Sequence, residues 1–386
     1  MHNAPHQGKI IQTYRGLREG LSQEELGQRI GRSRRTIVTL EQSAYIHDAR
    51  LRRTLAWALH IPHELLDLPE DTVAHVPIFH PVEESVTKDA KPLSRAFFET
   101  FTENLRMRLN LYYLGSAIAA NENLNTHIKR LTRMVKTCHP KDLNHLRALL
   151  SHNYQVKGLI ARDQLDFEVA EQCFQQASLF AQQGNIPDLN AVAMGRLAVV
   201  CLLQKRMDQA SQLYETARDI SKHSPASLRA YLAVGHAEVQ GNSGDKNCLK
   251  TLAEARSLAG RIDPEDDGLL LLHSTRCSER SVDDCWAQCH ALIGMPMIAL
   301  DHYDRLEKTL DLNMTRMRAR LNIQYAEALY SDKDLSCCFY LAEGWKLAHA
   351  TNSKLNTHRV QDFARKLAPS HPYDIRVKDL LQLVQG

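Results

Sequence analysis

The sequence contains no long hydrophobic run, which argues against a membrane-spanning helix. Such a helix needs about 20 consecutive apolar residues, whereas the longest apolar run here extends only from Leu197 to Leu203. The N-terminal residues M-H-N-A-P-H-Q-G-K also lack the hydrophobic core of a signal peptide. We therefore expect a cytoplasmic protein with no membrane partner.

Aromatic residues, glycine and proline are also scarce. Aromatics make up 6% of the chain, and its 386 residues include 17 Gly and 13 Pro. This composition favours an all-α fold over a β-rich one. The hydrophobic content of 44% can support a sizeable core, and the length predicts two or more domains.

The nine Cys are odd in number and have no disulfide-framework spacing, so we expect reduced thiols packed in the core. One group, Cys277, Cys285, Cys289 and His290, could suggest zinc because Cys285 and Cys289 share a helix face. Structural zinc sites more often use C-x2-C pairs on turns, and Trp286 is placed as a core residue. We expect no metal.

Catalytic motifs are missing as well. The sequence has no Walker loop, no G-x-G-x-x-G after a strand, no nucleophile elbow and no H-E-x-x-H. We therefore expect neither an enzyme nor a cofactor.

What is present is a compact motif that begins at Ser22, S-Q-E-E-L-G-Q-R-I-G-R-S-R-R-T-I-V-T-L-E. Ser22 and Glu25 form a capping box for one helix, and Ser33 can cap a second. Between the helices, Gly31 suits a left-handed backbone, and the small Gly27 permits a close crossing. Two short helices joined in this way form a helix-turn-helix, in which the second helix enters the DNA major groove.

The motif resembles the XRE (Cro/repressor-type) helix-turn-helix family over residues 8–68. An amphipathic helix around Ile10 and Tyr14 precedes it, and a helix around Leu55 and the ending "IPHELLDL" follow it. The resemblance implies a five-helix, lambda-repressor-like DNA-binding domain over residues 1–68. Gly27 departs from the family, which usually has alanine there, at a cost of up to about 1 kcal/mol.

Local charge agrees with a DNA-binding domain. Between Arg29 and Arg53, seven Arg stand against Glu41 and Asp48, a balance of +5, although the net charge of the whole chain is only +3. A basic patch of this size is what one small DNA-binding domain needs.

By position, the resemblance gives the residues of the motif roles on DNA. Gln23 would bond a phosphate, and Arg34, Arg35 and Thr39 would lie at base edges, where an arginine fork matches the two acceptors of guanine. The other arginines would contact phosphates. The full predicted set is Gln23, Arg32, Ser33, Arg34, Arg35, Thr36, Thr39, Arg50, Arg52 and Arg53. Two alternatives stay open: solvated surface charges, and a domain that contacts protein rather than DNA.

Residues 69–93 contain Pro69, Pro77, Pro81 and Pro92 and interrupt the helical periodicity, so we predict a linker there. Helices should resume at Ser94 and continue over 122–138 and 142–162.

Beyond this point, small and aromatic residues recur with the spacing of a tetratricopeptide (TPR) repeat. A first unit lies around Gly158 and Phe174, and a second follows 40 residues later. Weaker units surround Tyr231, Trp286 and Leu321, with an irregular insert at 261–281 and a closing helical pair at 354–384. The pattern predicts a TPR-like α-solenoid over residues 94–386.

A solenoid of this kind has a concave face lined by the first helix of each pair, which suits an extended peptide or a partner helix. Amide side chains can satisfy a peptide backbone, and arginines can hold a carboxylate. The predicted ligand-binding residues are His152, Gln155, Arg162, Arg196, Arg229, His236 and Asn322. Ordinary solvated helix surface is the alternative.

The two domains together resemble the peptide-responsive RRNPP-type regulators. The resemblance implies a quorum-sensing transcription factor that binds an operator in double-stranded DNA as a homodimer, with a short signalling peptide in its groove. Two alternatives stay open. The array could be a scaffold that recruits a partner protein to DNA, or the protein could be a repressor that needs no effector.

Overall fold

The computed structural model describes residues 6–17, 21–30, 32–59, 61, 63–67, 91–114, 117–261, 277, 279–310, 312–331 and 333–385. Every regular element within these ranges is a helix, so the all-α prediction is confirmed. The chain divides into two compact units, residues 1–84 and 85–386. The division falls within the predicted linker, of which residues 69–90 lie outside the described ranges.

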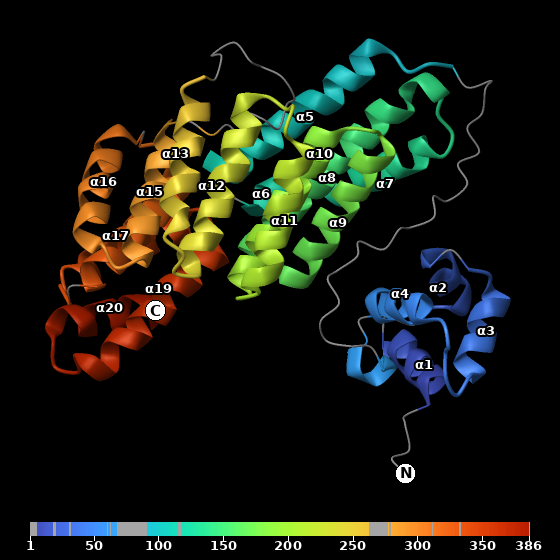
Figure 1. Cartoon of the computed structure of the whole chain (residues 1–386), viewed down its shortest axis with the longest axis horizontal. Coiled ribbons are helices and arrows are strands. Elements are labelled where there is room, and N and C mark those ends of the chain that lie inside the picture. The colour runs from blue at the N-terminus through green and yellow to red at the C-terminus, as the bar shows by residue number, and fades with distance from the viewer. Residues whose placement is uncertain are drawn as a thin grey trace. The chain divides into compact units, whose positions relative to one another are not determined.

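Unit 1 is a small globule of short helices (Figure 1). Its elements are α1 (Gln7–Leu17), α2 (Gln23–Arg29), α3 (Arg34–Gln42), α4 (Ala49–Leu59) and the short 3-10 helix η1 (His63–Leu66). Apolar residues spaced along each helix face one core, whose fully buried members are Ile11, Leu26, Ile37, Leu55, Leu59 and Leu66. Burial of each such side chain contributes roughly 1.5–3 kcal/mol to the stability of the fold. This shared core stabilises the short helices of unit 1.

Local sequence sets the boundaries of α2 and α3. The Ser22 hydroxyl accepts from the Glu25 backbone N–H, and the Glu25 carboxylate accepts from that of Ser22, so the predicted capping box is confirmed. Ser33 caps α3 in the same manner. A Cβ on Gly27 would lie 2.6 Å from the Arg32 carbonyl oxygen, so the close approach predicted there is also present. Gly31 lies outside the described residues.

Unit 2 opens with α5 (Arg95–Leu114), α6 (Ala117–Asn121) and α7 (Leu124–Val135), followed by the 3-10 turn η2 (Pro140–Asp142). Helical pairs then follow one another along the chain, and neighbours lie side by side in Figure 1. The pairs are α8 (Leu143–Asp163) with α9 (Phe167–Gln183), α10 (Pro187–Leu203) with α11 (Met207–Ile220), α12 (Ala226–Asn242) with α13 (Asn247–Ala259), α15 (Glu279–Leu292) with α16 (Pro296–Thr309), α17 (Thr315–Ser331) with α18 (Cys337–Ala350), and α19 (Lys354–Ser370) with α20 (Ile375–Gln385).

These pairs coincide with the six helical units predicted from the sequence, and consecutive helices pack as in helical repeats. Small residues let the helices of a pair approach closely: a Cβ on Gly158 would lie 2.7 Å from the ring of Phe174. The insert predicted at 261–281 lies mostly outside the described residues.

A recurrent turn joins the helices of the array. Leu165, Asn185 and Lys205 each have a left-handed backbone, with φ between 53° and 65°. In each case the next residue donates its N–H to a carbonyl five residues back, as Asp166 does to Ala161 at 2.9 Å. This is a Schellman-type helix ending, and it recurs after α8, α9 and α10.

Candidate functional site

The exposed face of α3 carries the two arginines predicted to read bases. Arg34 and Arg35 form its first turn and Arg32 precedes it, and all three side chains are exposed. Within the described part of the chain, the guanidinium groups of Arg34 and Arg35 have no hydrogen bond or ion pair. Because Ile37 and Leu40 bury the opposite face, α3 directs these cations outward, where they can meet a phosphate or a guanine edge.

The hydroxyl residues of the predicted set mainly serve the helix itself. The Ser33 hydroxyl accepts from the Thr36 N–H at 3.2 Å and lies 2.9 Å from the Thr36 hydroxyl. Thr39 donates its hydroxyl to the Arg35 carbonyl at 3.0 Å. Thr39 is nevertheless exposed, and its oxygen keeps lone pairs that can accept from a base.

A buried carboxylate fixes the orientation of α3. Glu41 accepts from Arg15 Nε at 2.5 Å and from Gln23 Nε2 at 2.7 Å, and Arg15 also donates to the Leu21 carbonyl at 2.7 Å. The carboxylate therefore ties α1, α2 and α3 together. The side-chain amide of Gln23 was predicted to bond a phosphate. In the free protein it donates to Glu41 instead.

Arg52 requires a correction, because it is a structural residue rather than a surface phosphate contact. Its side chain is buried, its guanidinium lies 4.9 Å from the Tyr45 ring centroid, and Nη1 donates to the Tyr45 hydroxyl at 2.6 Å and to the Leu66 carbonyl at 3.1 Å. It anchors η1 to α4. The side chains of Arg50 and Arg53 lie outside the described residues.

The predicted ligand-binding residues of unit 2 are more buried than a solvated groove would allow. His152, Gln155 and Arg196 are 5%, 0% and 2% exposed. Burial, and after it the nearby Arg196 cation, lowers the pKa of His152 to about 3, so the imidazole is neutral. Among their polar atoms, His152 Nδ1 and Gln155 Oε1 are buried with no hydrogen-bond partner, which is an energetically costly arrangement.

Tyrosines surround two of the predicted arginines. Arg162 Nη2 donates to the Tyr112 hydroxyl at 3.3 Å, and that hydroxyl donates to the Leu159 carbonyl at 3.3 Å. Arg196 is hydrogen-bonded to Tyr231, and burial raises the pKa of this phenol. Tyr112 is near the end of α5. This helix end therefore packs against the face of the array that was predicted to be an open groove.

The remaining predicted groove residues do not join this group. His236 Nδ1 accepts from Arg218 Nη1 at 3.0 Å, and its Nε2 lies 3.4 Å from the Ser211 hydroxyl; both partners are on α11. Burial, and then the Arg218 charge, lowers its pKa. Asn322 donates to a carbonyl of its own helix, that of Arg318, at 2.8 Å. Arg229, on α12, is half-buried.

Several residues that surround His152, Arg162 and Arg196 were not predicted from the sequence. They are Tyr112, Asp163, Tyr231 and Arg316. Tyr112 falls in the helix predicted to resume at Ser94, and the others lie in helices predicted only from the spacing of small and aromatic residues. No local pattern marks them, because their partners lie in other helices.

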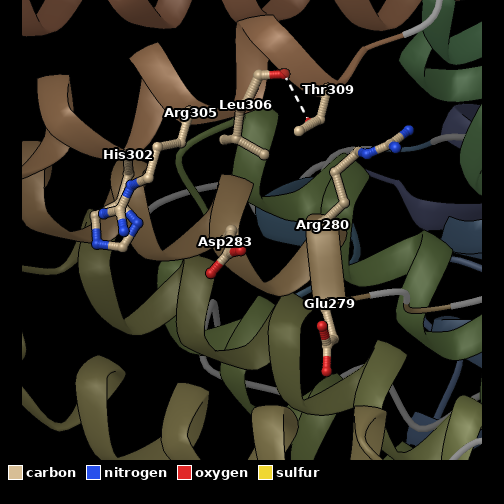
Figure 2. A pocket seen from close by; sticks show the side chains of 7 residues that line it. All are labelled: Glu279, Arg280, Asp283, His302, Arg305, Leu306 and Thr309. Atoms are coloured by element: carbon tan, nitrogen blue, oxygen red, sulfur yellow. Dashed lines mark hydrogen bonds between the residues drawn. The ribbon is translucent and has the colours of Figure 1, made fainter.

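An open hollow of about 600 Å³ lies between α15 and α16 (Figure 2). The lining side chains carry both signs of charge, and Thr309 bonds the Leu306 carbonyl at 2.9 Å. They are Glu279, Arg280, Asp283, His302, Arg305, Leu306 and Thr309. None of the residues predicted to bind a ligand contributes to it.

The cysteine group near α15 behaves as core. Cys285 and Cys289 lie with their sulfurs 3.9 Å apart, and their thiols donate to the carbonyls of Val234 and Ala237, both at 3.4 Å. Burial raises the pKa of Cys277 to about 12, which keeps it protonated and unreactive. No three His, Cys, Asp or Glu side chains among the described residues are placed to hold a metal ion.

None of the described helices has the length and apolar character needed to cross a membrane. Comparisons with protein families, with curated proteins and with solved structures found no match to this chain.

Proposed function

We propose that the protein is a cytoplasmic, sequence-specific DNA-binding transcriptional regulator of the XRE helix-turn-helix type. The observation that supports this most is α3 itself: a short helix capped at Ser33, anchored through Glu41, with Arg34 and Arg35 exposed in its first turn. Arginines presented in this way match the two acceptors of guanine in the major groove.

A homodimer on a two-fold operator is part of this proposal. One short helix reads only a few base pairs, and a second copy doubles the site at a spacing of about one helical turn of DNA. Selection of bound fragments from genomic DNA with the purified full-length protein tests this directly. We expect enriched sites with inverted half-sites; enrichment no greater than for bulk competitor DNA would refute the proposal.

Substitutions at α3 separate base reading from phosphate binding. Arg34→Ala or Arg35→Ala should each reduce operator affinity by about 1–3 kcal/mol and relax the base preference. Arg32→Ala should weaken all sequences alike and lower the salt dependence. Arg133→Ala, an exposed arginine on α7 of unit 2, is the matched control. Equal loss on operator and random DNA for Arg34→Ala would contradict base reading.

We propose further that unit 2 senses a short peptide through its first helices. Supporting this are the unpartnered Gln155 Oε1 and the arginines Arg162 and Arg196 on α8 and α10, since amides suit a peptide backbone and arginines a carboxylate. The low-molecular-weight peptide fraction of cells that carry the gene should change operator affinity. If no fraction does so at any concentration, peptide sensing fails.

A second candidate, a repressor that needs no effector, is favoured by one observation. His152, Gln155 and Arg196 are already buried in the free protein, so a ligand would have to displace existing contacts. Under this alternative, DNA binding depends on salt but not on any added molecule.

A further inference from the structure

The first helical pair of unit 2 meets the last two pairs through polar contacts, most of them buried. Asp163, at the end of α8, accepts from Arg316 Nη1 at 2.5 Å and from the Ser353 hydroxyl at 2.7 Å through the same oxygen. Beside them, Gln164 Nε2 donates to the Asn352 carbonyl at 2.9 Å. The array therefore returns to its own beginning, because residues about 150 to 190 positions apart are in contact.

Arg316 is the centre of this meeting point. It also donates from Nε to the Tyr112 carbonyl at 2.9 Å and from Nη2 to the Thr351 carbonyl at 3.1 Å, and its guanidinium lies 4.6 Å from the Tyr112 ring centroid. One side chain thus joins α5, α8, α17 and the turn between α18 and α19. We call the group Asp163, Arg316, Ser353 and the carbonyls of Tyr112 and Thr351 the clasp.

The clasp is buried, and one of its polar atoms has no hydrogen-bond partner. Arg316, Asp163 and Ser353 are 8%, 3% and 0% exposed, and the second carboxylate oxygen of Asp163 is buried with no hydrogen-bond partner. Removing either charged partner would leave the other buried and uncompensated. A buried polar network is stable when all its hydrogen bonds are formed and costly when only some are. The clasp should therefore be either fully closed or fully open, with intermediate arrangements disfavoured.

The clasp and the candidate ligand-binding cluster share a residue. Tyr112 gives its carbonyl to Arg316 and its hydroxyl to Arg162, which directly precedes Asp163 in α8. The two sides of the clasp belong to separate hydrophobic cores: α5, α8 and α9 share one, which includes Phe174, and α17 to α20 share the other, which includes Val360 and Leu367. The chain between the two cores runs through the intervening pairs, so the clasp can part without unfolding either core.

We propose that the clasp is the conformational switch of the array: when it opens, α17–α19 separate from the ends of α5 and α8 and uncover Arg162. The effect of the clasp on DNA binding rests on the proposed function, whereas its opening and closing do not. A ligand carboxylate that binds Arg162 replaces the hydrogen bond between Arg162 and the Tyr112 hydroxyl. Tyr112 is then less firmly held, which weakens its contact with Arg316. A ligand that prefers the open state shifts the population toward it.

Hydrogen exchange on the free full-length protein tests the clasp without DNA or ligand. In Arg316→Gln, exchange of backbone amides should rise at least tenfold in residues 109–114, 159–163 and 353–358, and stay within twofold in α10–α13. The control is Arg359→Gln, which removes an ion pair between α19 and α17, 3.0 Å to Glu327, and should leave all these segments unchanged. If Arg316→Gln does not fold, Asp163→Asn keeps the shape of the side chain and should give the same local pattern.

Unchanged exchange, or a uniform rise throughout unit 2, would overturn the clasp as a switch. Its regulatory role is tested on the operator recovered by selection: Arg316→Gln should change operator affinity at least fivefold, and Arg359→Gln should not. Equal affinities of the two variants would overturn the link to DNA binding. Failure to recover any operator counts against the proposed function alone, since the exchange result is obtained without DNA.

Discussion

Unit 1 holds Arg34 and Arg35 at its surface, whereas unit 2 buries Arg196 and Arg316. In unit 1, the exposed cations sit on a helix whose other face is fixed by a nearby core and by one carboxylate, Glu41. In unit 2, the cations lie among tyrosines and carbonyls contributed by helices that are far apart in the sequence.

The difference shows where a motif is a reliable guide to exposure. On an isolated helix face, exposure follows from the helical period alone. On the wall of a helical array, exposure depends on what else packs there, and here the end of α5 does so through Tyr112. The following experiments test this contrast, in order of decreasing effect.

Ala170→Glu should disrupt unit 2 and spare unit 1. Ala170 is fully buried at the crossing of α8 and α9, so a carboxylate there is both too large and unpaired, and we expect a loss of more than about 4 kcal/mol. Calorimetry should show the transition of unit 2 shifted or lost. Ala96→Glu, at an exposed position of α5, is the control, and an equal shift in the transition of unit 1 would contradict independent folding.

Glu41→Ala is the corresponding change in unit 1. It removes the shared partner of Arg15 and Gln23, and breaking such a largely buried pair costs about 3–5 kcal/mol. Unit 1 should unfold at lower temperature and operator binding should be lost, while the transition of unit 2 stays in place. Glu24→Ala, an exposed carboxylate in the same region, should have little effect; similar effects of the two variants would argue against the network.

The buried histidine of unit 2 should make its stability depend on pH. His152 has a pKa of about 3 in the folded protein and about 6.5 when unfolded, so the unfolded chain binds the extra proton between these values. Stability is therefore retained above pH 6.5 and lost as the pH falls toward 3, by about 2 kcal/mol between pH 7 and pH 5. Denaturant unfolding at the two pH values measures this.

His152→Gln should remove most of that pH dependence. The exposed His223→Gln should leave it in place. If the wild type and His152→Gln lose the same stability on acidification, the buried imidazole is not its source.

The smallest effect contrasts two glycines of unit 1. Gly16→Ala should stabilise α1 by up to about 1 kcal/mol, because nothing lies within 4 Å of the added Cβ. Gly27→Ala gains the same propensity but places Cβ 2.6 Å from the Arg32 carbonyl, so we expect a net loss of about 1 kcal/mol. Denaturant midpoints of the two variants should move in opposite directions; movement in the same direction would contradict the close crossing of α2.

The sequence was a good guide wherever the determinants are local. The capping box at Ser22 and Glu25 and the cap at Ser33 involve residues three apart, and the helical pairs follow from small residues such as Gly158 facing Phe174. The surroundings of His152, Arg162 and Arg196 could not be predicted, because they depend on helices that no short pattern connects.

Arg52 illustrates the same limit in unit 1. Its place among other arginines suggested a surface role, but its carbonyl partner at Leu66 lies 14 residues away. Only the tertiary arrangement of η1 against α4 shows that the side chain points inward.

The return of the array to its own beginning has a consequence for biosynthesis. Ser353 is made 190 residues after Asp163, which at about 5–20 residues per second corresponds to roughly 10–40 s of translation. Most arrays of helical repeats complete each unit as it leaves the ribosome, since units contact only their neighbours. Here the first pair emerges with an acidic side chain that must stay hydrated until the last pair arrives, so nascent chains truncated before Arg316 should be more open to protease and chaperone at α8 than the finished protein.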